Sequence, residues 1–265
     1  FLTAAFIFYL RAVKLGGDER LSRNLSASPV GLLNAMKTVM VERRAASANA
    51  IAAGVCFGIV ALGWKGFVYG PAIIFLAYLL QVAMNMFRRR DSTILNTLNI
   101  LMLGTIFLMV LPFYAHPQLD LVLNSTGLQP LLFIAGFTLA ITWITTGFRD
   151  KPWLLVLGTL FTGATVFFVG IYILQQLELS NAWEILTTGS GYFTKNKIFG
   201  TIAEASAPSR GQLFASFGPI VFVLAIVMGI IALWDGIVKK SQTKLILGMW
   251  VIVAAYMAWS AGRFL

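Results

Sequence analysis

The residues best suited to chemistry lie near the C-terminal end of the sequence, in two short motifs. Glu204 follows Thr201 and Ile202 in the motif TIAE, within the polar stretch 176–216. A carboxylate can bind a cation or a polar substrate, although an isolated carboxylate in a loop is ordinarily only solvated. Arg263 lies in the motif WSAGRFL. Its guanidinium either offers several donors to phosphate oxygens or simply extends to the membrane surface.

Other reactive residue types are scarce. His116 is the single histidine and Cys56 the single cysteine, so the sequence offers neither a disulfide framework nor a metal-ligand cluster. Asp235 lies near the end of an apolar segment, beside Lys239 and Lys240, where either a snorkelling or a paired terminal residue explains it. An ion-coupled transporter would carry ionisable groups near the middle of the membrane, and their scarcity in this sequence counts against that class.

The composition predicts the elements that must position these residues. The 265 residues are 58% hydrophobic and 11% charged, whereas a soluble domain is roughly half apolar and about a quarter charged. Too few polar residues remain to cover a globular surface, which argues against a soluble enzyme, a nucleic-acid-binding domain and a disordered chain. The sequence therefore predicts an all-α, polytopic transmembrane helical bundle.

Seven apolar segments are each long enough for a spanning helix, which needs about 20 predominantly apolar residues. They cover residues 48–64, 66–87, 94–114, 128–147, 153–175, 217–238 and 245–262. Residues 1–13 look like the second half of an eighth helix. Polar residues and prolines separate the segments, at Lys65 and Gly66, Arg88 to Arg90, Pro112 to Asp120, Arg149 to Lys151, and Lys239 to Lys244. We predict one transmembrane domain over residues 1–265, with about seven full spans and a partial first helix.

The positive charge predicts the orientation in the membrane. If the partial helix is the first crossing, 15 of the 20 Lys and Arg residues fall on one side, which is then cytoplasmic. The net charge of +10 is therefore a topology signal rather than a nucleic-acid surface. The stretch 14–47 becomes a cytoplasmic connector. Within it, residues 30–44 could lie along the membrane surface, although an ordinary helical connector is the favoured interpretation. The long loop 176–216 and Arg263 fall on the external side.

Four motifs together resemble the catalytic subunits of N-oligosaccharyltransferases of the single-subunit archaeal or bacterial type. GWKGFVY at 63–69 resembles the family's tryptophan-glycine-aromatic signature between two spans, with Lys65 where the family commonly has Gly. TIAE at 201–204 resembles its Thr-Ile-x-Glu motif in the long external loop. The Pro-Ser that follows, and FASFGPI at the start of the next span, also match. WSAGRF at 259–264 resembles the stretch with the family's arginine at the external membrane face.

The resemblance implies a fold, a reaction and a set of site residues. The fold is the membrane region of a GT-C-type glycosyltransferase. The reaction transfers an oligosaccharide from a polyprenyl or dolichyl (pyro)phosphate carrier to Asn in an Asn-x-Ser/Thr acceptor polypeptide. Glu204 would be the catalytic residue and a ligand of Mg²⁺ or Mn²⁺, Thr201 and Ile202 would position the acceptor, and Arg263 would bind the phosphate of the lipid-linked donor. The implied location is the plasma membrane of an archaeon or bacterium, with the active site outside and membrane lipids around it.

The family's remaining motifs have no counterpart in this sequence. The family has acidic motifs before the position of Phe1 and a soluble domain with a Trp-Trp-Asp-Tyr-Gly signature after the transmembrane region. The resemblance therefore implies a fragment that is inactive without the N- and C-terminal parts of the same protein. Two alternatives stay open: another polyprenyl-phosphate-dependent GT-C glycosyltransferase, and a non-enzymatic transporter or scaffold.

Overall fold

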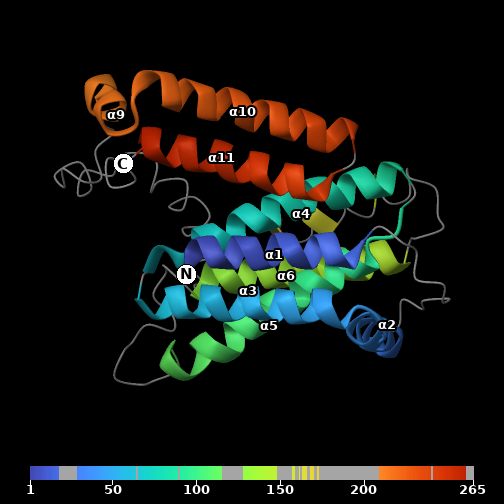
Figure 1. The fold of residues 1–265 in the computed structure, drawn as a ribbon. Helices are drawn as coiled ribbons and strands as arrows, with labels where there is room; N and C mark the ends of the chain where they lie inside the picture. Colours follow the sequence, from blue (N-terminus) through green and yellow to red (C-terminus); the bar gives the residue numbers. More distant parts are fainter. Residues whose placement is uncertain are drawn as a thin grey trace. The chain divides into compact units, whose positions relative to one another are not determined.

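The computed structural model describes residues 1–17, 29–63, 65–88, 90–114, 128–147, 209–239 and 241–260, with a few single positions from 157 to 172. Every element assigned in these ranges is helical (Figure 1), as the composition predicts. The chain divides into two compact units, Phe1–Leu160 and Phe161–Leu265.

The first unit is built on a row of packed helices. Its elements are α1 (Leu2–Gly16), α2 (Pro29–Glu42), α3 (Arg44–Gly63), the 3₁₀ helix η1 (Lys65–Val68), α4 (Tyr69–Phe87), α5 (Thr93–Tyr114) and α6 (Leu128–Gly147). Helix α3 packs against both α1 and α5, and α6 packs against α4 and α5. Small residues let α3 approach its neighbours closely. A Cβ atom added to Gly54 would lie 2.6 Å from the carbonyl oxygen of Met102 on α5.

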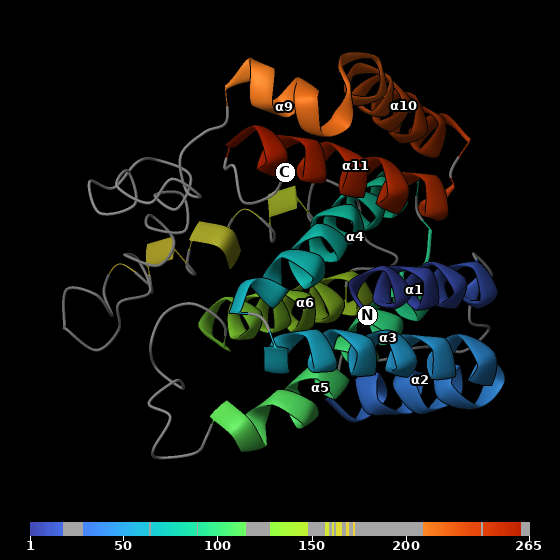
Figure 2. The same ribbon diagram turned by 60° about the vertical axis from the view of Figure 1, so that its left-hand side comes forward.

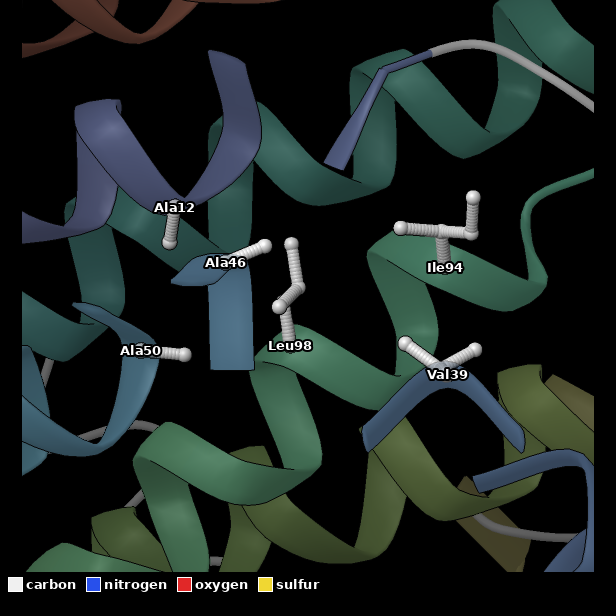
Figure 3. Close-up of a cluster of buried hydrophobic side chains, with 6 residues drawn as sticks. All are labelled: Ala12, Val39, Ala46, Ala50, Ile94 and Leu98. Atoms are coloured by element: carbon white, nitrogen blue, oxygen red, sulfur yellow. The ribbon is translucent and has the colours of Figure 1, made fainter. Parts of the chain in front are cut away.

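A cluster of buried apolar side chains joins four of these helices (Figure 3). Its members are Ala12 of α1, Val39 of α2, Ala46 and Ala50 of α3, and Ile94 and Leu98 of α5. Further along the bundle, Phe6 and Phe57 pack edge to face, with ring centroids 5.7 Å apart. Small side chains on α3 and larger ones on α5 therefore fill the space between the helices.

The second unit contains a helical hairpin. Its described elements are the short helix α9 (Arg210–Phe217), α10 (Pro219–Val238) and α11 (Gln242–Ser260), and α10 packs along α11. Glycines allow the close contact: a Cβ atom on Gly236 would lie 2.8 Å from the backbone nitrogen of Leu245, and one on Gly229 would lie 2.9 Å from Val251. This register makes the two helices antiparallel, so the start of α10 and the end of α11 share one end of the hairpin.

Among the described residues, four helices are long and apolar enough to cross a bilayer: Arg44–Gly63, Tyr69–Phe87, Thr93–Phe113 and Pro219–Val238. Shorter apolar stretches lie in α6 (Ile134–Thr145) and α11 (Thr243–Tyr256). The predicted span 153–175 lies outside the described residues, apart from a few single positions. The helices are thus those expected of an integral membrane protein, and the count of seven spans stays a prediction.

Several predicted boundaries differ from the observed ones. Helix α3 begins at Arg44 rather than at residue 48, because α2 leads into it with only Arg43 between them. The predicted span 94–114 agrees with α5, although Pro112, predicted to mark the following loop, lies inside the helix. Without an N–H group, Pro112 removes one hydrogen bond from the last turns of α5. The predicted breaks after residue 64 and after Phe87 are confirmed by η1 and by the end of α4.

Candidate functional site

The four predicted site residues, Thr201, Ile202, Glu204 and Arg263, all lie outside the described residues. The structure instead shows the elements that flank them. Ser209 follows the TIAE motif and begins α9, and Ser260 ends α11 shortly before Arg263. Because α10 and α11 are antiparallel, these two flanking segments lie at the same end of the hairpin.

Ser209, five residues after the TIAE motif, is the N-terminal cap of α9. Its Oγ accepts a hydrogen bond from the backbone N–H of Gln212 at 3.2 Å, and its own backbone N–H donates to Oε1 of Gln212 at 3.0 Å. This reciprocal capping box satisfies two backbone donors at the start of α9. The last part of the stretch 176–216, predicted as an irregular loop, is therefore helical.

A glycine turn separates α9 from α10. Gly218 has φ +76°, a conformation that residues with a Cβ atom rarely adopt, and Pro219 then begins α10. The rings of Phe217 and Phe222 lie across this turn with centroids 6.0 Å apart. The motif FASFGPI, predicted as the opening of one span, is therefore divided between two helices.

The motif GWKGFVY forms the turn between α3 and α4. Its residues Lys65–Val68 are the 3₁₀ helix η1, and Phe67 within it is fully buried. Gly70, at the start of α4, lies against the ring of Phe57, where a Cβ atom would clash. A buried aromatic ring and a close glycine contact therefore hold this turn against the end of α3.

A buried polar network inside the first unit was missed by the sequence reasoning. The hydroxyl of Tyr9 donates to Oδ1 of Asn99 at 3.0 Å. The hydroxyl of Tyr78 donates to Oδ1 of Asn96 at 2.9 Å, and Nδ2 of Asn96 donates to Oγ1 of Thr145 at 2.9 Å. These bonds join α1, α4, α5 and α6 inside the apolar bundle.

Further buried polar side chains bond one another near the end of α4. Nε2 of Gln81 donates to Oδ1 of Asn85 at 3.0 Å, and Nδ2 of Asn85 donates to Oγ of Ser92 at 3.1 Å. Ser92, Asn96 and Asn99 recur at the spacing of one helix face, a signal visible in the sequence. Charge does not reveal these residues in the sequence, because all of their side chains are neutral. Neutral amides and hydroxyls that bond one another join helices, and this arrangement offers no acid or base.

The oxygen Oε1 of Gln81 and the Oγ of Ser47 are buried without a hydrogen-bond partner among the described residues. Buried polar atoms are usually bonded, often to an ordered water molecule. Within the described part of the chain, no group of three or more His, Cys, Asp or Glu side chains is arranged to hold a metal ion.

Comparison with protein families, with curated proteins and with solved structures finds no match to this chain. The functional assignment therefore depends on the motifs and on the elements that carry them.

Proposed function

We propose that this chain is the second half of the transmembrane region of an N-oligosaccharyltransferase. The observation that carries the proposal is the ordered set of motifs GWKGFVY, TIAE, FASFGPI and WSAGRF in the sequence. The hairpin geometry supports it, because the segments that flank TIAE and WSAGRF share one end of α10 and α11. A carboxylate and a guanidinium near one membrane face suit a reaction at a lipid-linked phosphate.

The reaction joins the amide nitrogen of an acceptor Asn to the first sugar carbon of the donor. The bond from that carbon to the carrier's phosphate oxygen breaks, the carrier leaves as a (pyro)phosphate, and the amide nitrogen loses a proton. In this proposal Arg263 binds the departing phosphate with its fork of N–H donors. Thr201 and Ile202 hold the acceptor beside Glu204.

Glu204 has the second role of metal ligand in the proposal. Mg²⁺ and Mn²⁺ prefer oxygen ligands, and a carboxylate supplies them. When bound, such a cation neutralises charge that develops on phosphate oxygens. One carboxylate provides only part of a six-coordinate shell, so further ligands must come from acidic motifs that the family has elsewhere. We therefore expect this chain to act together with those parts of the protein, and to be inactive without them.

The direct test replaces Glu204 by Gln in a protein that also carries the family's acidic motifs and soluble domain. We expect transfer of oligosaccharide to an Asn-x-Thr peptide to fall by about 100-fold or more, the usual order for loss of a charge-stabilising group. Glu184→Gln, in the same stretch 176–216, is the matched control and should leave transfer nearly unchanged. Normal transfer by the Glu204 variant would remove the metal-site assignment.

The same assay separates the two rival functions. A different GT-C glycosyltransferase would transfer sugar from the lipid carrier but leave the Asn-x-Thr peptide unmodified. A transporter or scaffold would consume no lipid-linked donor. Either result would contradict the oligosaccharyltransferase proposal, whatever the behaviour of the Glu204 variant.

A further inference from the structure

Helix α2 lies across the end of the first unit rather than along it. Figure 1 looks nearly along the axis of α2 and shows α1 and α3 from the side, and Figure 2 shows α2 from its side. The helix contacts both α3 and α5. Its fourteen residues extend about 21 Å, less than the roughly 30 Å of a bilayer core. Helix α2 is therefore unsuited to crossing the membrane, and it runs across the direction of the spanning helix α3.

One face of α2 is fixed to the bundle. Ala35 is 2% exposed and Val39 is fully buried, and Val39 belongs to the cluster with Ala46 of α3 and Ile94 of α5 (Figure 3). These contacts lie close to the first turns of both spanning helices. Since Arg43 alone separates α2 from α3, a bilayer around α3 must have its surface at the level of α2.

The opposite face of α2 is also apolar and is uncovered in the structure. Val30, Leu33, Met40 and Val41 are 40% to 66% exposed. At 100° per residue, these four positions lie on the side of the helix away from Ala35 and Val39. Asn34 and Lys37 are also exposed on this side, but four large apolar side chains together are more than a helical connector in water would expose.

A basic residue lies among the exposed apolar side chains. Lys37 is exposed, and its position falls on the same side of α2 as Leu33 and Val41. Glu42 is exposed on a different side. Long basic side chains can place their stems along acyl chains while the charged groups reach lipid phosphates. Apolar and basic residues on one side are the combination found on helices that bind anionic membrane surfaces.

We propose that α2 is an interfacial helix that lies in the surface of an anionic lipid bilayer, with Val30, Leu33, Met40 and Val41 inserted and Lys37 at the phosphates. The level of α2 beside the start of α3 selects a lipid surface as the occupant. A second copy of the chain, or another segment of the same protein, would cover the apolar side without a need for basic residues. The helix would then fix the depth of the first unit in the bilayer.

The test measures the surroundings of α2 with nitroxide labels. Single cysteines replace Val41 and, as the matched control, Glu42, in the full chain with Cys56→Ala, reconstituted in phosphatidylcholine vesicles with phosphatidylglycerol. Relaxation by oxygen reports contact with acyl chains, and relaxation by a water-soluble nickel complex reports contact with water. We expect the Val41 label to respond severalfold more to oxygen than to nickel, and the Glu42 label to show the reverse.

Each other outcome overturns the proposal in a recognisable way. Strong nickel relaxation at both positions would mean that the apolar side faces water. Weak relaxation by both reagents at Val41 would mean that protein covers it, and dipolar broadening between labels would identify that protein as a second copy.

A charge variant tests the lipid selectivity separately. Lys37→Glu should raise nickel relaxation of the Val41 label in vesicles with phosphatidylglycerol and change it little in pure phosphatidylcholine. Lys14→Glu, at the end of α1, is the matched control and should have little effect on this label in either membrane. Equal effects of Lys37→Glu in both membranes would contradict the role of anionic headgroups.

Discussion

Helices α5 and α10 are similar in length and apolar character but differ in how much of each is buried. Both are apolar enough to cross a bilayer. Within an 18-residue apolar stretch of each helix, 56% is buried in α5 and only 17% in α10. Helix α5 lies at the centre of the first unit, in contact with α3, α6, α1 and α2. Helix α10 packs along α11 and exposes most of its apolar side chains. Overall hydropathy therefore identifies a spanning helix without saying whether protein or lipid surrounds it.

The difference lies in the polar residues. Helix α5 carries buried Asn96, Thr97 and Asn99, whose side chains bond to other helices or to their own backbone. The described acid of α10 is Asp235, at its end, where Oδ2 pairs with Lys239 at 3.0 Å and Lys244 at 2.6 Å. Polar residues within a membrane helix are costly unless bonded, so they mark the helix that lies inside the bundle.

The comparison predicts the largest difference for leucine truncation. Leu98 of α5 is 1% exposed and Leu224 of α10 is 54% exposed. Leu98→Ala should lower the free energy of unfolding by about 2 to 5 kcal/mol because it leaves a cavity. Leu224→Ala should change it by about 0.5 kcal/mol or less. Titration of the purified chain with SDS in mixed micelles measures both, and a large effect at Leu224 would show that protein covers α10.

Enlarging a glycine should have the next largest effect. Gly54→Leu places side-chain atoms against the Met102 carbonyl and Thr105, and it should cost about 1 to 3 kcal/mol. Gly104→Leu, on α5, is the control, because nothing lies within 4 Å of the added Cβ. It should be neutral or slightly stabilising, since Leu favours a helix by up to about 1 kcal/mol over Gly. Equal costs for the two variants in the same unfolding assay would contradict the close contact of α3 with α5.

Loss of a hydrogen bond in the buried polar network should lower the free energy of unfolding by less than the two substitutions above. Asn96→Leu removes the partner of the Tyr78 and Thr145 hydroxyls and should cost about 1 to 2 kcal/mol. Asn49→Leu is the control, since the amide of Asn49 bonds to the Ala45 carbonyl of its own helix. A double-mutant cycle with Tyr78→Phe should give a coupling of about 0.6 kcal/mol or more. Zero coupling would show that the hydrogen bond between Tyr78 and Asn96 does not stabilise the fold.

The ion pairs of the hairpin should have the smallest effect. Asp235→Asn should destabilise the hairpin less than any of the substitutions above, because Lys239 and Lys244 are well exposed to solvent. Unfolding is measured at low and high salt. The difference in the free energy of unfolding between the native chain and the variant should shrink as the salt concentration rises. A cost that is large and independent of salt would instead indicate a buried pair.

Much of the fold was predictable because membrane helices carry strong local signals. The breaks at Lys65 and after Phe87 follow from charge and glycine in apolar sequence, and the structure confirms both. For Asp235 the sequence left a snorkelling and a paired residue open, and the structure shows pairs with Lys239 and Lys244. The helix α9 was missed, since its start depends on the side-chain hydrogen bonds of Ser209 and Gln212 rather than on apolar periodicity.

For the candidate site, the sequence predicts the motifs but not the positions of their side chains. Glu204 and Arg263 were selected by resemblance and by their charge in an otherwise apolar chain, and their roles stay predictions. The order of the spans already predicts that the loop 176–216 and Arg263 share one side of the membrane. The structure adds the contacts of Gly229 and Gly236 that hold α10 against α11.

Composition and the spacing of charges were sufficient to determine that the chain forms apolar helices of membrane-spanning length, because backbone polar groups in a bilayer must be satisfied within each helix. The surroundings of each helix were decided only by the tertiary structure. Apolar side chains suit lipid and protein equally well, so the close contacts of glycines and the partners of Asn96 and Asn99 select which face turns inward. For the same reason, only packing shows that α2 buries Val39 and leaves Val41 uncovered.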